Sequence, residues 1–212
     1  PSEISEDQYI AVRAFLSQFK QIFSINYDLL FYWARNKNSL APANYTTDDG
    51  FRKGRQWKGY GTDQEVHFLH GGLHIYDTGE VIKKHACTED GDTIIQQVRA
   101  NLDAGRFPLF VSEPTYQKKR YKVTHNPYLS FCYRKLGEIG GALFIHGHSM
   151  DENDKHIFDQ VKSSRVTRVF VSIYGDEYSE ANTRTKANAK AFIEKLDKDV
   201  AFYQAESTPV WA

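Results

Sequence analysis

The stretch Phe23-Ser24-Ile25-Asn26-Tyr27-Asp28 decides how this chain folds. A short apolar run that starts at Ile22 ends in an amide, a phenol and a carboxylate, and the strongly apolar segment 29–33 follows at once. This pattern predicts a strand that runs into a helix, with polar groups at the carboxyl end of the strand. In open α/β sheets, ligands bind outside those carboxyl ends.

Two later stretches repeat this design. They are Val66-His67-Phe68-Leu69-His70-Gly71-Gly72 and Leu143-Phe144-Ile145-His146-Gly147-His148-Ser149. Each is an apolar run too short for a helix of its own, and each ends in histidine and glycine. We therefore expect the polar residues of three strand ends to line one site.

Strands and helices alternate through much of the chain. Besides these strands, the pattern predicts strands at 108–114 and 168–174 and helices at 6–20, 92–104, 128–136, 153–163 and 179–199. The alternation favours an α/β fold, namely a Rossmann-like, mostly parallel sheet with helices on both faces. The glycines within 65–84 predict a partly antiparallel hairpin insertion. With 212 residues, we expect one domain over 1–212.

The long irregular segment 36–61 is expected to be a loop or lid inserted in this domain. Basic and aromatic residues alternate in it, as at Arg52, Lys53 and Trp57. Such a mixture is typical of a surface for single-stranded nucleic acid, but also of a solvated loop that its aromatic residues anchor. The basic run 118–122 has a similar pair of interpretations, a solvated face or a phosphate clamp.

Composition limits the partners and the compartment. The 27 basic and 27 acidic residues give a net charge of zero, so nucleic acid is not expected as a partner. No apolar run reaches the roughly 20 residues that a membrane span needs, so no membrane is expected either. Only two cysteines occur, Cys87 and Cys132, and both are expected to be reduced thiols. A cytoplasmic protein is therefore predicted.

The strand-end residues suggest specific chemistry. The Asn26 amide could bind a ribose or orient a water, and the Asp28 carboxylate could meet a carboxamide, although Asn-Tyr-Asp after a strand is also typical of a plain helix cap. His70 is the better candidate for a general base, because histidine titrates near neutral pH. Gly71 after it would let a ligand approach the backbone.

A metal site is the alternative at the third strand end. His146 and His148 would share a face of a strand, and with Asp151 they are similar to the His-x-His-x-Asp-His pattern of metallo-β-lactamase-like hydrolases. In that pattern the aspartate lies two positions after the second histidine and a histidine follows it directly. Here Asp151 lies three positions after His148, and the next residue is not a histidine. We therefore expect no metal, a buried His146 that donates to a carbonyl, and His148 at a helix start.

Taken in order, the motifs resemble a known superfamily. Phe23-Ser-Ile-Asn-Tyr-Asp28, Phe68-Leu-His-Gly71, Phe144-Ile-His-Gly-His-Ser149 and Val169-Phe-Val-Ser-Ile-Tyr174 are similar to the ordered motifs of the sirtuin-like superfamily. Within that superfamily they resemble an uncharacterised bacterial domain-of-unknown-function branch, whose relatives in antiviral defence hydrolyse NAD. The motifs span residues 23–175.

The resemblance implies NAD as the substrate and cleavage of its nicotinamide–ribose bond. It assigns the ribose or the water to Asn26, the nicotinamide amide to Asp28, and the general base to His70. The nucleotide-binding positions that it implies are Tyr27, Gly71, Gly147, His148, Ser149 and Asp151. The zinc module of sirtuins, built from two Cys-x-x-Cys pairs, has no counterpart in this sequence. No metal and no protein deacylation are therefore expected.

The superfamily's first strand and its glycine-rich turn would precede Asn26, where only the predicted helix 6–20 occurs. We therefore expect this chain to be the C-terminal part of a longer protein, or a version without the turn. Because that turn normally binds the pyrophosphate, NAD binding by these residues alone is expected to be weak. The expected partners are a nucleotide and either the missing segment or a second copy. The alternative functions are a non-catalytic nucleotide-binding or oligomerising module of the same fold, and a metal-dependent hydrolase at His146 and His148.

Overall fold

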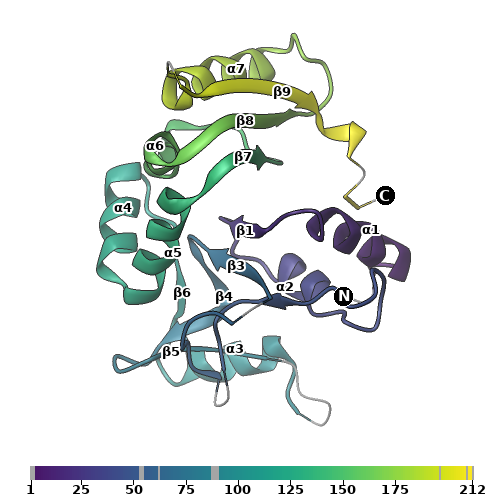
Figure 1. The fold of residues 1–212 in the computed structure, drawn as a ribbon. Helices are drawn as coiled ribbons and strands as arrows, with labels where there is room; N and C mark the ends of the chain where they lie inside the picture. The colour runs from purple at the N-terminus through teal and green to yellow at the C-terminus, as the bar shows by residue number, and fades with distance from the viewer. Residues whose placement is uncertain are drawn as a thin grey trace. The chain divides into compact units, whose positions relative to one another are not determined.

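The computed structural model describes residues 3–52, 55–61, 63–86, 91–195, 197–208 and 210–211. Over these residues the chain is mixed α/β, with two parallel sheets and one antiparallel sheet of three strands each (Figure 1). It divides into two compact units, Pro1–Val111 with Val210–Ala212, and Ser112–Pro209. The single domain expected over 1–212 stays a prediction.

The parallel sheet of the first unit places two of the predicted strand ends side by side. Its order is β1-β3-β2, and Ser24 at the end of β1 is the register partner of Phe68 at the end of β3. The bounds are α1 Glu6–Leu16, β1 Gln21–Ser24, α2 Leu30–Arg35, β2 Thr47–Asp48 and β3 Gln64–Phe68. The predicted strand that runs into a helix is therefore confirmed as β1 and α2.

The antiparallel sheet of the first unit confirms the predicted hairpin. Its order is β5-β4-β6, with the bounds β4 Gly71–Asp77, β5 Ile82–Lys84 and β6 Pro108–Phe110. The turn between β4 and β5 contains Gly79, whose φ of +86° lies in the left-handed region that glycine adopts readily. Helix α3, Ile94–Asp103, lies between β5 and β6 in the sequence.

Local capping explains where several helices begin. At α1, the Ser5 side chain accepts from the backbone of Gln8, whose side chain accepts from the Ser5 backbone in return. Asn126 Oδ1 accepts from two backbone N–H groups at the start of α5, where Pro127 is the first helical residue. Both starts were predicted from the sequence, whereas α1 ends at Leu16 and not near residue 20.

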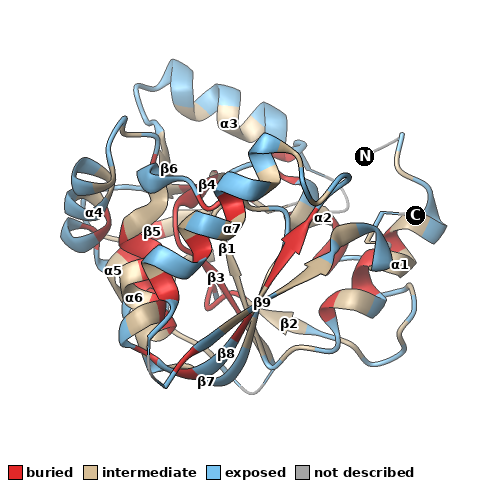
Figure 2. Cartoon of the chain, turned by 90° about the horizontal axis from the view of Figure 1, so that it is seen from above, coloured by how far each residue is buried: buried red, intermediate tan, exposed pale blue. Residues whose placement is uncertain are grey.

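The second unit contains the other parallel sheet, of order β7-β8-β9. Its elements are α4 Tyr116–His125, α5 Pro127–Glu138, β7 Gly140–Ile145, η2 Glu152–Asp154, α6 Lys155–Ser163, β8 Arg165–Ile173, α7 Glu180–Ile193, β9 Asp199–Gln204 and η3 Ala205–Ser207. Figure 2 colours residues of α5 and α6 as buried, and these residues include Cys132 of α5 and Phe158 of α6. Cys132 is thus described, whereas Cys87 lies outside the described residues, so the two reduced thiols stay a prediction.

The predicted helix over 179–199 was too long. Helix α7 ends at Ile193, and Glu194 after it has an extended backbone with ψ of 139°. Residues Asp199–Gln204 form β9, which pairs with β8 in parallel from the Arg168–Asp199 register onward. The strand was missed because its pairing partner is distant in the sequence, while the helical pattern before it is strong.

The segment 36–61 is fixed to the first unit by several contacts. The buried guanidinium of Arg13 donates to the carbonyls of Ala41 and Tyr45. Phe51 is buried, and the Trp57 backbone donates to the Ile82 carbonyl. These contacts fit the interpretation of a loop that its aromatic residues anchor; residues 53–54 lie outside the described residues, and the lid stays a prediction.

A buried charge cluster joins three elements of this unit. Asp49 Oδ2 accepts from Arg35 Nη1 at 2.8 Å and from Lys84 Nζ at 2.6 Å. Arg35 and Asp49 are 3% exposed and Lys84 is 15% exposed. Burial raises the pKa of Asp49, but the two cations outweigh it and lower that pKa to about 2. The carboxylate is therefore required to keep two cations inside the protein.

We predict that Asp49→Asn lowers the free energy of unfolding by about 3 to 5 kcal/mol, because it leaves buried cations without an anion. Urea unfolding at pH 7 measures this loss. Asp103→Asn, at an exposed position of α3, is the control and should change stability little. An equal effect of both substitutions would contradict the cluster's role.

The same carboxylate predicts a pH dependence. The folded-state pKa of Asp49 is depressed from 3.8 to about 2, so its contribution is present above pH 4 and is lost as the pH falls toward 2. The stability difference between wild type and Asp49→Asn should therefore shrink over this interval. Urea midpoints measured between pH 6 and 2.5 test this, and a difference that stays constant would contradict it.

Candidate functional site

The loop after β1 is fixed in place through its backbone. The Asn26 N–H donates to Ser24 Oγ at 3.2 Å, and the Tyr27 carbonyl accepts from the Leu73 N–H at 2.9 Å. Leu73 belongs to β4, so this bond joins the loop to the antiparallel sheet. The three predicted site residues Asn26, Tyr27 and Asp28 therefore lie at the carboxyl edge of the parallel sheet.

The side chains of Asn26, Tyr27 and Asp28 differ in the contacts that they already make within the protein. Asp28 Oδ1 accepts from the Leu30 N–H at 2.8 Å at the start of α2, so the helix-cap interpretation holds for this residue. Tyr27 is 46% exposed, with its ring centroid 5.5 Å from that of Phe110. The Asn26 carboxamide is exposed and makes no hydrogen bond to any residue that the structure describes. Asn26 is thus the most available polar group of this loop.

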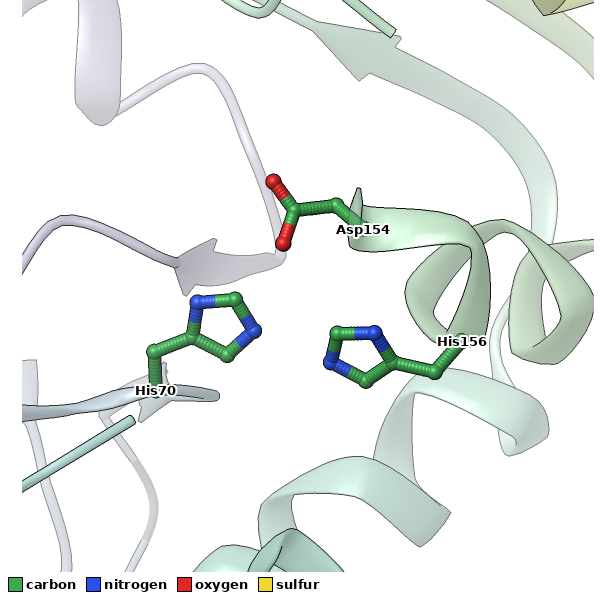
Figure 3. A group of neighbouring side chains, drawn as sticks. All are labelled: His70, Asp154 and His156. Carbon is green, nitrogen blue, oxygen red and sulfur yellow. The ribbon is translucent and has the colours of Figure 1, made fainter. Parts of the chain in front are cut away.

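His70 lies at the same edge of the sheet as Asn26. It occupies the short connection between β3 and β4 and is 3% exposed (Figure 3). The Leu69 N–H donates to the Ser24 carbonyl at 2.8 Å, and the His70 carbonyl accepts from the Val111 N–H at 2.9 Å. These bonds fix the connection between the end of β1 and the segment after β6. The structure therefore brings Asn26 and His70 to neighbouring strand ends.

Gly71 allows this connection to turn. Its φ is +71°, and a Cβ atom built on it would lie 2.0 Å from the Leu109 carbonyl oxygen. A side chain therefore fits at this position only if the backbone of β6 moves away. Gly71 is needed for packing between β4 and β6, in addition to any role beside a ligand.

His74 is a buried histidine that the sequence analysis did not single out. Its ring centroid lies 4.8 Å from those of Tyr32 and Phe68, and neither ring nitrogen has a hydrogen-bond partner among the described residues. Burial lowers the pKa of His74 to about 3, so its imidazole is neutral at physiological pH. It is a packing residue on β4 and lacks the basicity of a general base.

The loop after β7 gives the predicted site residues of the second unit. Gly147 has φ of +69°, and no heavy atom of the described residues would lie within 4 Å of a Cβ atom there. Its N–H donates to Ser172 Oγ at 2.9 Å, whereas the Ser149 side chain is exposed and makes no hydrogen bond within the described part of the chain. Ser149 is thus available for a ligand, and the Gly147 N–H is not.

His148 and Asp151 hold the turn that leads to α6. His148 Nδ1 accepts from the Met150 N–H at 2.8 Å, and its Nε2 lies 3.3 Å from Asp154 Oδ2. Asp151 Oδ1 accepts from the Asn153 N–H at 2.9 Å and caps η2. Figure 3 shows Asp154 and His156 where η2 passes into α6. The side chains of His148 and Asp151, both predicted to bind the nucleotide, therefore already accept hydrogen bonds from the backbone of this turn.

His146 differs from its prediction. It is exposed, and its Nδ1 lies 3.0 Å from Tyr203 Oη on β9, so the expected buried histidine that donates to a carbonyl was wrong. Strand β7 ends at Ile145, and the positive φ of Gly147 interrupts the alternation that would have put His146 and His148 on one face. The two histidines bind different partners, which does not favour a shared metal ion.

Comparisons with known proteins identify a family. The family model described as "Domain of unknown function (DUF4917)" matches residues 1–211. The chain therefore belongs to this family. No curated protein and no solved structure matches the chain with significance. Across the helices of the described ranges, none combines the length and the apolarity that crossing a membrane requires.

We predict that Gly71→Ala destabilises the protein more than Gly79→Ala. Both glycines have positive φ, which costs alanine about 1 to 2 kcal/mol, but only at Gly71 would the new methyl group collide with a carbonyl. Urea unfolding of the two variants separates the collision from the backbone cost, because Gly79 has open space around it. Equal losses would show that β6 moves freely away from β4.

Proposed function

We propose that this member of the family is a Rossmann-like, sirtuin-like domain that processes NAD by cleaving the nicotinamide–ribose bond. One observation carries the proposal: Asn26 and His70 follow the neighbouring parallel strands β1 and β3, whose last residues are in register. The carboxyl edge of a parallel sheet is where α/β proteins bind ligands. The order of motifs that resembles the sirtuin-like superfamily assigns the same two residues to the reaction.

The side chains suit hydrolysis at this edge. In the proposed reaction a water oxygen bonds to the anomeric carbon of the ribose, the bond to the nicotinamide nitrogen breaks, and neutral nicotinamide leaves. The proton of the water passes to His70, the general base. The Asn26 carboxamide, which both donates and accepts, holds the water or a ribose hydroxyl. Asp28 has a second carboxylate oxygen to accept from the nicotinamide amide, since Oδ1 caps α2.

In the second unit we propose a nucleotide-binding role for the loop after β7. It too follows a strand of a parallel sheet, and the exposed hydroxyl of Ser149 can donate to a phosphate or ribose oxygen. Gly147 provides open space beside its backbone. The antiparallel sheet β5-β4-β6 is an addition to the proposed Rossmann-like fold.

A non-catalytic nucleotide-binding module is the second candidate function. Two observations favour it: His70 is only 3% exposed, and one oxygen of Asp28 is already used by the start of α2. A module of this kind would bind NAD or ADP-ribose without releasing nicotinamide. Binding and turnover therefore have to be measured separately.

We predict that His70→Ala and Asn26→Ala each lower the rate of nicotinamide release from NAD by about 10² to 10⁴, because each removes a group that acts on the water or ribose. Release is measured by chromatography with purified protein. Asn38→Ala, at an exposed position after α2, and His125→Ala, at an exposed position of α4, are matched controls that should keep the wild-type rate.

The outcomes separate the two candidates. NAD hydrolysis that depends on both residues supports the enzyme. Binding of NAD by wild type without nicotinamide release contradicts hydrolysis and favours the non-catalytic module. An undiminished rate in His70→Ala removes the proposed base.

A further inference from the structure

Helices α6 and α7 cover one face of the parallel sheet β7-β8-β9. Helix α6 connects β7 to β8, α7 connects β8 to β9, and the strands lie side by side in the order of the sequence. Because such connections are nearly always right-handed, two that advance in the same direction place their helices on the same face. The rings of Phe158 on α6 and Phe192 on α7 are stacked with their centroids 5.7 Å apart, which agrees with this arrangement.

Side chains alternate between the two faces of this sheet along β8. Val169 and Val171 are fully buried, whereas Arg168 is exposed and Phe170 is only partly buried. Successive side chains of a strand point to opposite faces, so the two valines face the helices and the other two lie on the opposite face with their register partners. We call this opposite surface the open face, and its residues are Phe144 on β7, Arg168 and Phe170 on β8, and Asp199 and Ala201 on β9.

The open face has an aromatic centre and one charge of each sign beside it. Phe144 is 45% exposed, and its ring is stacked on that of Phe170 with the centroids 4.8 Å apart. Arg168 and Asp199 are exposed register partners, and within the described residues neither forms an ion pair. Parallel sheets are normally covered on both faces. Stacked aromatic side chains on an uncovered face therefore indicate a surface that binds a partner.

We propose that the open face binds the open face of a second copy of this chain, across a two-fold axis that runs parallel to the strands between β8 and β9. This rotation keeps the position of each residue along the strand and places β8 of one copy over β9 of the other. Arg168 then faces Asp199 of the second copy, and Asp199 faces Arg168 of the second copy. The two charges that are adjacent within one copy thus form two ion pairs between copies.

The same symmetry matches large side chains with small ones. Phe170 and Ala201 are register partners, so each Phe170 faces Ala201 of the second copy, and side chains of two packed sheets interdigitate in this way. Phe144 beside Phe170 extends the apolar contact. The charges of the open face sum to zero, which favours a second copy over a polyanion such as single-stranded nucleic acid. The inference does not depend on the proposed function.

Sedimentation equilibrium of the full chain tests the dimer. Three short strands offer less area than the interface of a permanent dimer, so we expect a reversible equilibrium between monomer and dimer over micromolar to millimolar concentrations. Monomer throughout this range overturns the proposal, and it is the result expected where another segment of the same chain covers the open face.

Charge reversal tests which residues meet. Arg168→Asp and Asp199→Arg each place like charges opposite one another, so each should weaken the Kd of the dimer by about tenfold or more. An equal mixture of the two variants should form mixed dimers with about the wild-type Kd, because both contacts of a mixed dimer again join opposite charges. Arg184→Asp and Glu180→Lys, at exposed positions of α7, change the net charge by the same amounts and should leave the Kd unchanged.

A size substitution tests the apolar contact without changing a charge. Ala201→Phe fills the space opposite Phe170 and should weaken the dimer, whereas Ala181→Phe, at an exposed position of α7, should not. Circular dichroism checks that each variant folds.

Three further outcomes overturn the proposal. A dimer whose Kd neither charge reversal changes uses another surface. Weakening by each reversal without recovery in the mixture contradicts the two-fold arrangement. A monomeric protein that binds an oligodeoxythymidine probe, and loses this binding in Phe144→Ala, assigns the open face to nucleic acid instead.

Discussion

The carboxylate of Asp49 is the interaction on which the first unit depends. Through Oδ2 it joins Arg35, the last residue of α2, to Lys84, the last residue of β5, while Asp49 itself follows β2. The Asp49 carboxylate thus holds together one helix, α2, and segments at the ends of β2 and β5, which belong to different sheets. Because α2 begins directly after the loop of Asn26 and Asp28, the position of that loop depends on how α2 is held.

Helix α2 also depends on a second buried cation. It has only six residues, too few to be stable alone in water. The Arg13 guanidinium donates to the carbonyls of Ala34 and Arg35 at the carboxyl end of this helix, where a positive charge is favourable. Burial lowers the pKa of Arg13, and its other donors go to further carbonyls. Tertiary contacts thus hold the helix that follows the proposed catalytic loop.

The parts of the fold that could be predicted have local causes. An apolar run before a polar stop indicated β1, and helices were predicted to begin at residues 6 and 128. The caps of these helices, Ser5 and Asn126, are local, because each lies within three residues of the backbone N–H groups that it binds. The buried cluster could not be predicted, since Asp49 lies 14 positions from Arg35 and 35 from Lys84. Strand β9 was missed for a similar reason, because its partner β8 is distant in sequence.

The candidate sites show a different limit of sequence patterns. The same short polar residues are suited to cap the turn after a strand and to bind a ligand there. The residue type alone therefore does not separate these two roles. The structure separates them by what each side chain already binds. Asp28, His148 and Asp151 accept backbone N–H groups of their own loops.

Asn26 and Ser149 have side chains that make no such bond within the described residues, although they come from the same motifs. A polar group that the fold does not use contributes little to stability while its side chain remains in water. Its presence at the carboxyl end of a parallel strand therefore favours a role in binding over one in folding. By this reasoning the chemistry that we propose for the first unit would centre on Asn26, while Asp28 caps the start of α2.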